Sequence, residues 1–498
     1  MQYISTRDAG LSVSASQAIA SGISAEGGLF VPASIPTVSK AWIEQLATLE
    51  YPDRAVKVLE LFLTDYSAQE LEEAVTDAYT DGVFEDDWAA PLSDLSDGRY
   101  ILELWHGPTC AFKDMALQLM PHLLVDAARR ELGGRQVMIL VATSGDTGKA
   151  ALEGFRDVEG VKLAVFYPDQ GVSPMQRLQM TTQPGENVAV YAIEGNFDNA
   201  QTQVKKIFAD RETADLLARE NTVLSSANSI NWGRLVPQVV YYFSAYADLV
   251  GCGDIEMGDE INAVVPTGNF GNILAGYYAR RMGLPIKKLI CASNRNDVLT
   301  DFIRDGKYDA NREFHTTLSP SMDILISSNI ERLLFELTGK DSAKVSHMMR
   351  ELAQNRRYEI DAALHDTLCE AFWGGSLDDE GCKAKIKETF DTLGYLVDPH
   401  TAVAMGVYDQ YKKETGDETP AVILSTASPY KFARAVLDAL GERQPEDEFA
   451  AVAQLARTTG TQPPDSISAL RTAKIRFTRV IAPTEMPETV VAFAAGVE

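Results

Sequence analysis

Cysteine and histidine are both scarce in this chain of 498 residues. The five cysteines are scattered, odd in number and never in Cys-x-x-Cys spacing, so neither a disulfide framework nor a cysteine zinc site is expected. The six histidines show no His-Glu-x-x-His pattern or other paired spacing, and we expect no metal site. Unpaired thiols are typical of the cytosol, where they stay reduced.

The chain also lacks long apolar runs. None approaches the roughly 20 residues that a membrane-spanning helix needs. The N-terminal sequence, Met-Gln-Tyr-Ile-Ser-Thr-Arg-Asp, has neither the basic nor the apolar region of a signal peptide. We therefore expect a cytoplasmic protein without a membrane partner.

Basic residues are few. The chain has 45 Lys and Arg against 71 Asp and Glu, a net charge of −26. This deficit disfavours nucleic-acid binding, which needs clustered basic side chains to displace counterions, and binding to anionic membranes. An anionic ligand would be repelled at long range, so any phosphate site must be built locally from a few residues.

The pattern of the chain changes near residue 95. Before it, apolar residues at helical spacing over Trp42–Leu49 and Leu59–Ala78 predict a mostly helical N-terminal unit. After it, short apolar runs alternate with amphipathic stretches, which predicts parallel sheets with helices on both faces. Pro121 should stop or kink one helix. The expected strands are Val137–Ala142, Lys162–Tyr167, Val188–Ile193, Ile261–Val265, Lys288–Ala292 and Ala421–Leu424, with another near Val480 and Ile481; expected helices include Ala200–Ala218 and Asn272–Met282.

Polar loops follow three of these strands. They are Thr143-Ser-Gly-Asp-Thr-Gly148, Pro266-Thr-Gly-Asn-Phe-Gly-Asn272 and Ser425-Thr-Ala-Ser-Pro429. Open parallel sheets bind ligands outside the carboxyl ends of their strands. The three loops therefore predict one ligand cleft.

A lysine in an unusual setting completes the pattern. Lys113 lies between Phe112 and Asp114 at an expected loop-to-helix junction, after a turn shaped by Gly107-Pro108. Most lysines are solvated surface groups. We interpret this one as the anchor of a carbonyl cofactor, because the strand-end loops supply the rest of a site.

Each loop also has a plainer interpretation. The glycine-rich segment 268–272 before a helix suits a phosphate cradle or an ordinary strand-to-helix turn. Segment 143–149 resembles a nucleotide P-loop, but that motif needs Gly at 143 and Ser or Thr at 150, where the chain has Thr143 and Ala150. The same turn suits a carboxylate ligand or a simple helix N-cap.

Two further clusters are polar. Ser226–Arg234 suits a phosphate ligand through the guanidinium fork, or is a capped helix start with a surface arginine. Near the last strand end, Thr426 or the adjacent Ser425 offers a hydroxyl. Asp398 and His400 lie at a turn where a histidine is more often structural, and we assign them no catalytic role.

Together and in this order, the segments resemble threonine synthase, a pyridoxal-phosphate (PLP) enzyme of the tryptophan-synthase-β fold type. The resemblance runs from Ala25-Glu-Gly-Gly-Leu-Phe-Val31 to Leu424-Ser-Thr-Ala-Ser-Pro429. It implies an α/β fold with two parallel-sheet domains and a mostly helical N-terminal unit. The expected limits are 1–95 for the N-terminal unit, 96–130 and 228–498 for the large PLP-binding domain, and 131–227 for the small substrate-binding domain.

The resemblance also implies roles for individual residues. Lys113 would hold PLP covalently and move protons. The other cofactor contacts would be Gly268, Asn269, Phe270, Gly271 and Asn272 to the phosphate, Thr426 to the pyridine nitrogen, and Asp146 near the phenolic oxygen. Asp146 departs from the Asn of many relatives, and a carboxylate there would repel a phenolate unless one of them is protonated. The substrate contacts would be Thr143, Ser144 and Thr147 to the carboxylate, with Asn228, Ser229 and Arg234 to the phosphate.

The implied reaction is γ-elimination of phosphate from O-phospho-L-homoserine followed by addition of water at Cβ, giving L-threonine in the last step of its biosynthesis. We expect this small molecule as partner, in a monomer or small homo-oligomer. The alternatives are a PLP-dependent threonine or serine dehydratase, which needs no second phosphate site, and a non-catalytic threonine-synthase-like protein that only binds its ligand.

Overall fold

The computed structural model describes residues 1–80, 82–169, 172–195 and 197–497. Two sheets organise the chain, and both are built mainly from parallel strands, as the alternating pattern predicts. The larger has the order β13-β10-β9-β14-β4-β3, in which only β3 is antiparallel. Its strands are β3 (Leu92–Asp94), β4 (Arg99–Glu103), β9 (Ile261–Pro266), β10 (Ile286–Ser293), β13 (Phe372–Ser376) and β14 (Ala421–Ser425).

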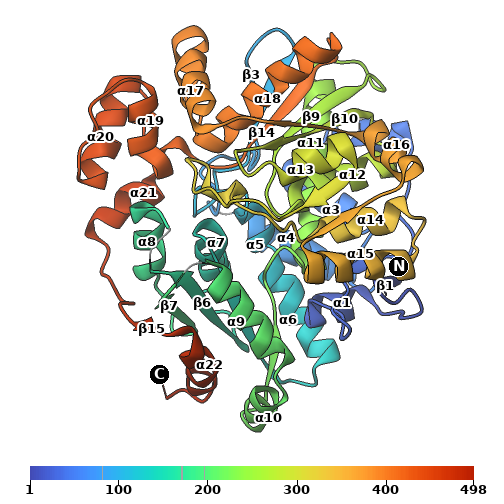
Figure 1. Ribbon diagram of the computed structural model, residues 1–498, viewed down its shortest axis with the longest axis vertical. Coiled ribbons are helices and arrows are strands. Elements are labelled where there is room, and N and C mark those ends of the chain that lie inside the picture. The colour runs from blue at the N-terminus through green and yellow to red at the C-terminus, as the bar shows by residue number, and fades with distance from the viewer. Residues whose placement is uncertain (81, 170–171, 196, 498) are drawn as a thin grey trace.

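The smaller sheet is entirely parallel, with the order β15-β7-β6-β5-β8. Its strands are β5 (Gln136–Ala142), β6 (Val161–Pro168), β7 (Val188–Ile193), β8 (Thr222–Ser225) and β15 (Val480–Ile481). Figure 1 shows this sheet and its helices in the lower part of the molecule and the larger sheet above it.

Burial on both faces explains why the strands are continuous apolar runs. In β5, Val137, Ile139 and Val141 pack into the core on the side of α7 (Asp146–Gly154), whereas Met138 and Leu140 pack with α9 (Phe197–Ala209). Side chains of a strand alternate between faces, so a strand covered by helices on both sides needs an apolar residue at every position.

Helices cover the larger sheet in the same way. α11 (Trp232–Cys252) and α12 (Gly271–Met282) lie in the same core as Ala263 and Val265 of β9, and α18 (Pro399–Thr415) packs with Val264. The remaining helices of this part are α13 (Val298–Asp305), α14 (Ile330–Leu337), α15 (Ser342–Asn355), α16 (Ala362–Ala371), α17 (Asp379–Leu393), α19 (Ala433–Ala439), α20 (Glu448–Thr459) and α21 (Asp465–Ala469).

The N-terminal unit is mostly helical, as expected. It contains the strand pair β1 (Tyr3–Ser5) and β2 (Phe30–Pro32), with α1 (Ala15–Ser21), α2 (Lys40–Leu46), α3 (Tyr51–Leu59) and α4 (Ala68–Tyr79). It shares a core with α11, where the buried Trp232 ring contacts the rings of Tyr3 and Phe62. No helix among the described residues is both long and apolar enough to cross a bilayer.

Several expected helices break where a side chain caps a new N-terminus. The stretch Ala200–Ala218 is two helices, α9 and α10 (Arg211–Arg219), because Asp210 accepts the backbone N–H of Thr213 and starts the second. Likewise Leu59–Ala78 holds only the end of α3 before the capping box of Ser67 begins α4.

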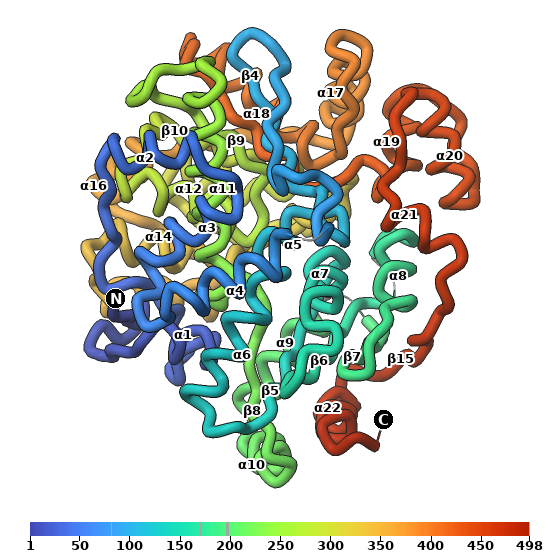
Figure 2. Tube along the Cα trace, turned by 180° about the vertical axis from the view of Figure 1, so that it is seen from behind, coloured from blue at the N-terminus to red at the C-terminus, as the bar shows by residue number. Residues whose placement is uncertain are grey.

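Pro121 acts as predicted. The helix after Lys113 is the short α5 (Asp114–Leu117), and α6 (Met120–Glu131) begins anew with Pro121 in its first turn. α5 and α7 lie side by side where the two sheets meet (Figures 1 and 2).

The C-terminal tail corrects the expected domain limits. The sequence assigns all of 228–498 to the large domain, but Val480–Ile481 form β15, which pairs with β7 of the smaller sheet. α22 (Met486–Ala494) then packs on α9 and α10. Figure 2 shows the red tail running along the small-sheet side of the molecule. The strand itself is confirmed, but its hydrogen-bond partner lies so far back in the chain that local pattern could not assign it.

Candidate active site

The turn that carries Lys113 (residues 107–113, the lysine turn) is joined directly to the loop that follows β14. The backbone N–H of Phe112 donates to the carbonyl of Thr426 at 2.9 Å, and Ala111 forms a bridge with Ala427. Within the turn, the buried Asp114 carboxylate accepts the backbone N–H of Thr109 at 2.8 Å and its hydroxyl at 2.7 Å. These bonds fix the backbone from which the Lys113 side chain extends.

Lys113 reaches Asp146 of the smaller-sheet part and Ser321 of the larger-sheet part. Its side chain is 7% exposed, with Nζ 3.2 Å from Asp146 Oδ2 and 3.1 Å from Ser321 Oγ. Burial lowers the pKa of Lys113, and the Asp146 carboxylate opposes this shift. The structure thus brings Lys113 next to the loop after β5 (Thr143–Gly148, the β5 loop), as predicted. Burial there favours the neutral form of the Lys113 amine more than a solvated surface position would.

Asp146 is the most heavily engaged group in the site. Its Oδ1 accepts from Lys431 Nζ at 2.5 Å and Gln176 Nε2 at 2.8 Å, and its Oδ2 accepts from Lys113 and Ser321. Burial alone would raise its pKa, but the ammonium groups of Lys431 and Lys113 hold the pKa well below the usual range. Asp146 is therefore a carboxylate. Lys431, which balances its charge, was not predicted from the sequence.

The rest of the β5 loop divides into two kinds of residue. Thr143 Oγ1 accepts the backbone N–H groups of Gly145 and Gly148, both at 2.9 Å, so this hydroxyl mainly builds the turn. Ser144 and Thr147 are half-buried, and their hydroxyls have no hydrogen-bond partner among the described residues. Of the three predicted carboxylate contacts, these two retain free hydroxyls.

The glycine-rich loop after β9 has the geometry of a cradle. Phe270 adopts a left-handed conformation with φ of 64°, and α12 starts at Gly271 with its first N–H groups free of intrahelical partners. Asn272 Oδ1 accepts the hydroxyls of Tyr241 at 2.6 Å and Tyr242 at 2.9 Å, while its Nδ2 is buried and has no partner among the residues described. An oriented, unsatisfied amide beside a helix N-terminus fits a phosphate oxygen.

A neighbouring loop holds this cradle. Asn329, just before α14, donates its backbone N–H and its Nδ2 to the carbonyl of Asn269, at 3.1 and 3.0 Å. Ser327 donates to the carbonyl of Gly268 at 2.9 Å. These hydrogen bonds hold the carbonyls of Gly268 and Asn269 toward the loop that contains Ser327 and Asn329.

We predict that Gly268→Ala weakens cofactor binding at least about tenfold. A Cβ at this position would lie 2.5 Å from the carbonyl oxygen of Ser321, so the cradle or the Ser321 segment must move. Equilibrium titration of the apoprotein with PLP, followed by fluorescence, measures the loss. Gly251→Ala, at an exposed position in α11 where the new Cβ would have its nearest neighbour at 3.4 Å, controls for general effects of the substitution on folding. Unchanged affinity in Gly268→Ala would contradict the assigned cradle.

Arg234 is a buried cation that pairs with no carboxylate among the described residues. Its side chain is 4% exposed; one guanidinium nitrogen donates to the carbonyl of Ala227 at 2.9 Å, and Nε has no partner. Burial lowers the pKa of Arg234 to about 10, so it stays charged at neutral pH. The alternative of a surface arginine is therefore wrong. Asn228 and Ser229, half-buried, precede it on the same segment.

A second buried arginine, missed by the sequence analysis, supports this segment. Arg332 of α14 donates to the carbonyls of Phe30 at 2.9 Å, Ile230 at 2.5 Å and Ser229 at 3.4 Å, and to Asn329 Oδ1. One side chain thus ties the N-terminal unit to the predicted substrate segment and to the loop that holds the cradle.

Ser425 and Thr426, the two alternatives at the end of β14, differ in whether their hydroxyls already have hydrogen-bond partners. Ser425 Oγ accepts from Trp105 Nε1 at 3.0 Å and Thr401 Oγ1 at 3.1 Å. The hydroxyl of Thr426, a buried residue, has no hydrogen-bond partner among the described residues. Thr426 is thus the better placed of the two to serve a ligand.

His400 has a structural part here. Its Nδ1 lies 2.5 Å from Asp398 Oδ2, and its Nε2 accepts the backbone N–H of Ser321 at 3.2 Å. Because Nε2 is the acceptor, the proton is on Nδ1. The histidine therefore holds the short helix Pro320–Met322, from which Ser321 reaches Lys113.

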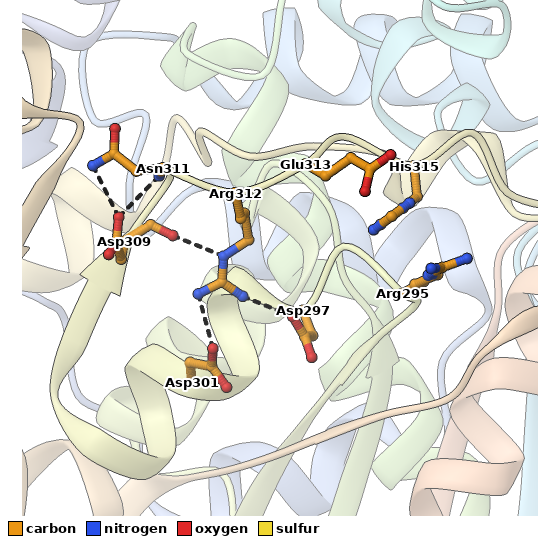
Figure 3. Close-up of a pocket in the computed structure, with 8 residues that line it drawn as sticks. All are labelled: Arg295, Asp297, Asp301, Asp309, Asn311, Arg312, Glu313 and His315. Carbon is orange, nitrogen blue, oxygen red and sulfur yellow. Dashed lines mark hydrogen bonds and ion pairs between the residues drawn. The ribbon is translucent and has the colours of Figure 1, made fainter.

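A separate surface pocket of about 370 Å³ lies between β11 (Lys307–Asp309) and the loop after β10 (Figure 3). There Arg312 pairs with Asp297 at 2.7 Å and Asp301 at 2.8 Å, so its charge is already neutralised. The described lining of this pocket contains none of the predicted site residues.

Family models cover nearly the whole chain. "Threonine synthase N terminus" matches residues 2–79, "Pyridoxal-phosphate dependent enzyme" matches 90–427, and "Threonine synthase, C-terminal" matches 401–490. Human "Threonine synthase-like 1" is 44% identical over 435 residues, which cover 85% of this chain; the chain spans only 58% of that protein's length. Threonine synthase of Pseudomonas aeruginosa is 39% identical, covering 88% of this chain and 90% of that protein.

Solved structures agree. The PLP-bound threonine synthase of Brucella melitensis superposes with a TM-score of 0.87 at 38% identity, covering 99% of both chains. The yeast enzyme gives a TM-score of 0.88 at 33% identity, covering 100% of this chain and 99% of that one. These findings confirm the fold expected from the resemblance. The chain belongs to the threonine synthase family of pyridoxal-phosphate-dependent enzymes.

Proposed function

We propose that this chain converts O-phospho-L-homoserine and water into L-threonine and phosphate, with PLP attached to Lys113. The observation that carries the proposal is a pair of separate, unsatisfied donor groups near a buried lysine. Asn272 Nδ2 lies in the glycine-rich cradle and Arg234 Nε on α11, and both are buried without a hydrogen-bond partner in the part of the chain that the structure describes. One suits the phosphate of the cofactor and the other the phosphate of the substrate.

The residues of the site fit PLP. Gly268, Asn269, Phe270, Gly271 and Asn272 would hold its phosphate, and Thr426 would face its pyridine nitrogen. When bound, PLP supplies an electron sink for negative charge at Cα of an amino acid. A neutral hydroxyl partner stabilises a protonated pyridine less than a carboxylate does, so substrate orientation must contribute more.

Lys113 would act as both anchor and base. Its Nζ is held beside Asp146 and Ser321, and burial favours the neutral amine that can accept a proton. In the proposed reaction, this nitrogen takes and returns protons at Cα and Cβ of the substrate. A covalent anchor places it close to both positions, which raises its effective concentration.

The substrate would be held at both ends. The free hydroxyls of Ser144 and Thr147 suit its carboxylate, while Thr143 supports their turn. Arg234, with Asn228 and Ser229, suits its phosphate and stabilises the dianion as it leaves Cγ. A dehydratase has no use for this second phosphate site, and the buried, unpaired Arg234 therefore favours the synthase.

Product analysis tests the proposal. The holoenzyme is incubated with O-phospho-L-homoserine, and released phosphate and L-threonine are both quantified. Equal amounts of the two products are expected. Oxoacid formation from threonine without phosphate release would indicate a dehydratase, and tight substrate binding without turnover would indicate a ligand-binding protein.

We further infer that the protein is cytoplasmic, serves threonine biosynthesis, and is a monomer or small homo-oligomer. All five cysteines are unpaired, which fits a reducing compartment. The net charge of −26 fits a protein without nucleic-acid partners.

A further inference from the structure

We propose that Lys431 is a positioning residue that neutralises Asp146 and so keeps the Lys113 amine free for covalent and proton-transfer chemistry. The inference depends on the proposed role of Lys113. It assigns a task to a buried lysine that has no part in the mechanism described above.

Lys431 is placed by the strand-end loop of β14. It lies in the short helix Pro429–Phe432, whose start is capped by Ser428. Its side chain has no exposed surface, and Nζ donates to Asp146 Oδ1 at 2.5 Å and to the carbonyl of Thr109 at 3.1 Å. It therefore contacts both the lysine turn and the β5 loop.

The two carboxylate oxygens of Asp146 serve different lysines. Oδ1 faces Lys431, with Gln176, and Oδ2 faces Lys113, with Ser321. The Lys431 contact at 2.5 Å is the shorter one, and the Lys113 contact at 3.2 Å is the looser one. This asymmetry matches a stable ion pair on one side and a lysine that must exchange partners on the other.

The ion pair between Lys431 and Asp146 determines whether Lys113 can be neutral. With Lys431 charged, Asp146 is already neutralised, and a neutral Lys113 leaves no net charge between these three groups. Without Lys431, the carboxylate would have Lys113 as its only cation among the described contacts and would hold it as an ammonium ion. An ammonium ion can neither attack an aldehyde nor accept a proton.

The ion pair between Lys431 and Asp146 also reduces the repulsion that the sequence predicts between the Asp146 carboxylate and a phenolate of the cofactor. A lone carboxylate repels a nearby anionic ligand atom, whereas a carboxylate paired with an ammonium ion presents little net charge. The other charged groups around Lys113 and Lys431 do not replace this balance. Arg234 adds a second positive influence on Lys113, and Asp114, which faces Lys431, is occupied by Thr109.

A double-mutant cycle on the apoprotein tests the proposal without using turnover. Trace acetylation with acetic anhydride, followed by peptide mass spectrometry, gives the pH midpoint at which Lys113 becomes reactive. In Lys431→Met, the midpoint should rise by about one pH unit or more, which lowers reactivity at neutral pH roughly tenfold. In Asp146→Asn it should fall, because two cations then lack their counter-ion. In the double variant it should return toward the wild-type value.

Two further measurements distinguish a charge effect of Lys431 from a purely structural role. The rate of PLP uptake by each apoprotein, followed by the visible absorption band, should show the same order of pH midpoints. Lys431→Arg, which keeps the charge, should stay within about half a pH unit of wild type. If Lys431→Met fails to fold, Lys431→Gln, which also removes the charge but keeps a polar side chain, takes its place, and its midpoint should likewise rise.

An unchanged Lys113 midpoint in a folded variant that removes the Lys431 charge, or in folded Asp146→Asn, would overturn the proposal and leave Lys431 a structural residue only. If wild-type protein formed no visible band with PLP while the acetylation midpoints shifted as expected, the proposed role of Lys113 would fail but the charge balance would stand.

Discussion

Lys113→Ala is expected to abolish the visible absorption band of bound PLP and to lower turnover by at least about 10³-fold, because one side chain supplies both the covalent anchor and the base. The chain should still fold. Asp146 keeps its shorter ion pair with Lys431, so the substitution does not leave this buried carboxylate without a cation. The measurements are an absorption spectrum with PLP, a threonine-formation assay, and circular dichroism to confirm folding.

Lys149→Ala provides a matched control. Lys149 is also 7% exposed and lies on α7, near the same loop. Its Nζ bonds to Glu153 at 2.8 Å and Gln183 at 2.5 Å, away from the predicted cofactor contacts. This variant should lose stability but keep the absorption band. Normal turnover in folded Lys113→Ala, or loss of the band in both variants to the same extent, would refute the assignment.

The parts of the fold that sequence could predict are those with a local cause. β5, β9 and β14 are apolar at nearly every position because helices cover both of their faces, and the polar residues directly after them mark the ligand edge. The lysine turn can be recognised in the sequence because Gly107 and Lys113 lie close together along the chain. A Cβ at Gly107 would in fact lie 2.5 Å from the side chain of Asp114.

The parts that sequence could not predict depend on contacts between distant segments. Ser321 reaches Lys113 from the short helix Pro320–Met322, which His400 holds, and nothing in its neighbouring residues indicates this. Lys431 and Arg332 look like ordinary helix-end or surface cations until their partners are known. A charged residue can be recognised as buried only when the group that neutralises it has been located. In Lys431 the one available hint was its position just after a strand-end loop.

The helix breaks show the same limit at shorter range. Apolar periodicity continues smoothly from α9 into α10, so the period predicts one helix. The boundary is set by the Asp210 side chain, which competes for the backbone N–H of Thr213. Periodicity reports which face is buried, whereas capping decides where a helix ends.

Arg234→Met is expected to raise KM for O-phospho-L-homoserine by roughly 10² to 10³-fold and to leave the PLP absorption band in place. The substitution keeps most of the apolar volume but removes the cation predicted to pair with the substrate phosphate. Losing charge-assisted hydrogen bonds to a buried dianion costs about 3–4 kcal/mol, which corresponds to this range. Steady-state kinetics with substrate concentrations that span the shifted KM provide the measurement.

Arg54→Met is the matched control for this prediction. Arg54 is as deeply buried as Arg234, but it pairs with Asp248 at 2.5 Å and Ser244 Oγ at 2.8 Å between α3 and α11. Its loss should reduce stability without changing KM, because it leaves the Asp248 carboxylate unpaired and removes no predicted substrate contact. An unchanged KM in folded Arg234→Met would assign the substrate phosphate to other donors. Arg234 Nε has no hydrogen-bond partner among the described residues, so removing it breaks fewer native contacts than removing Arg54. The stability of the Arg234→Met apoprotein should therefore fall less than that of Arg54→Met.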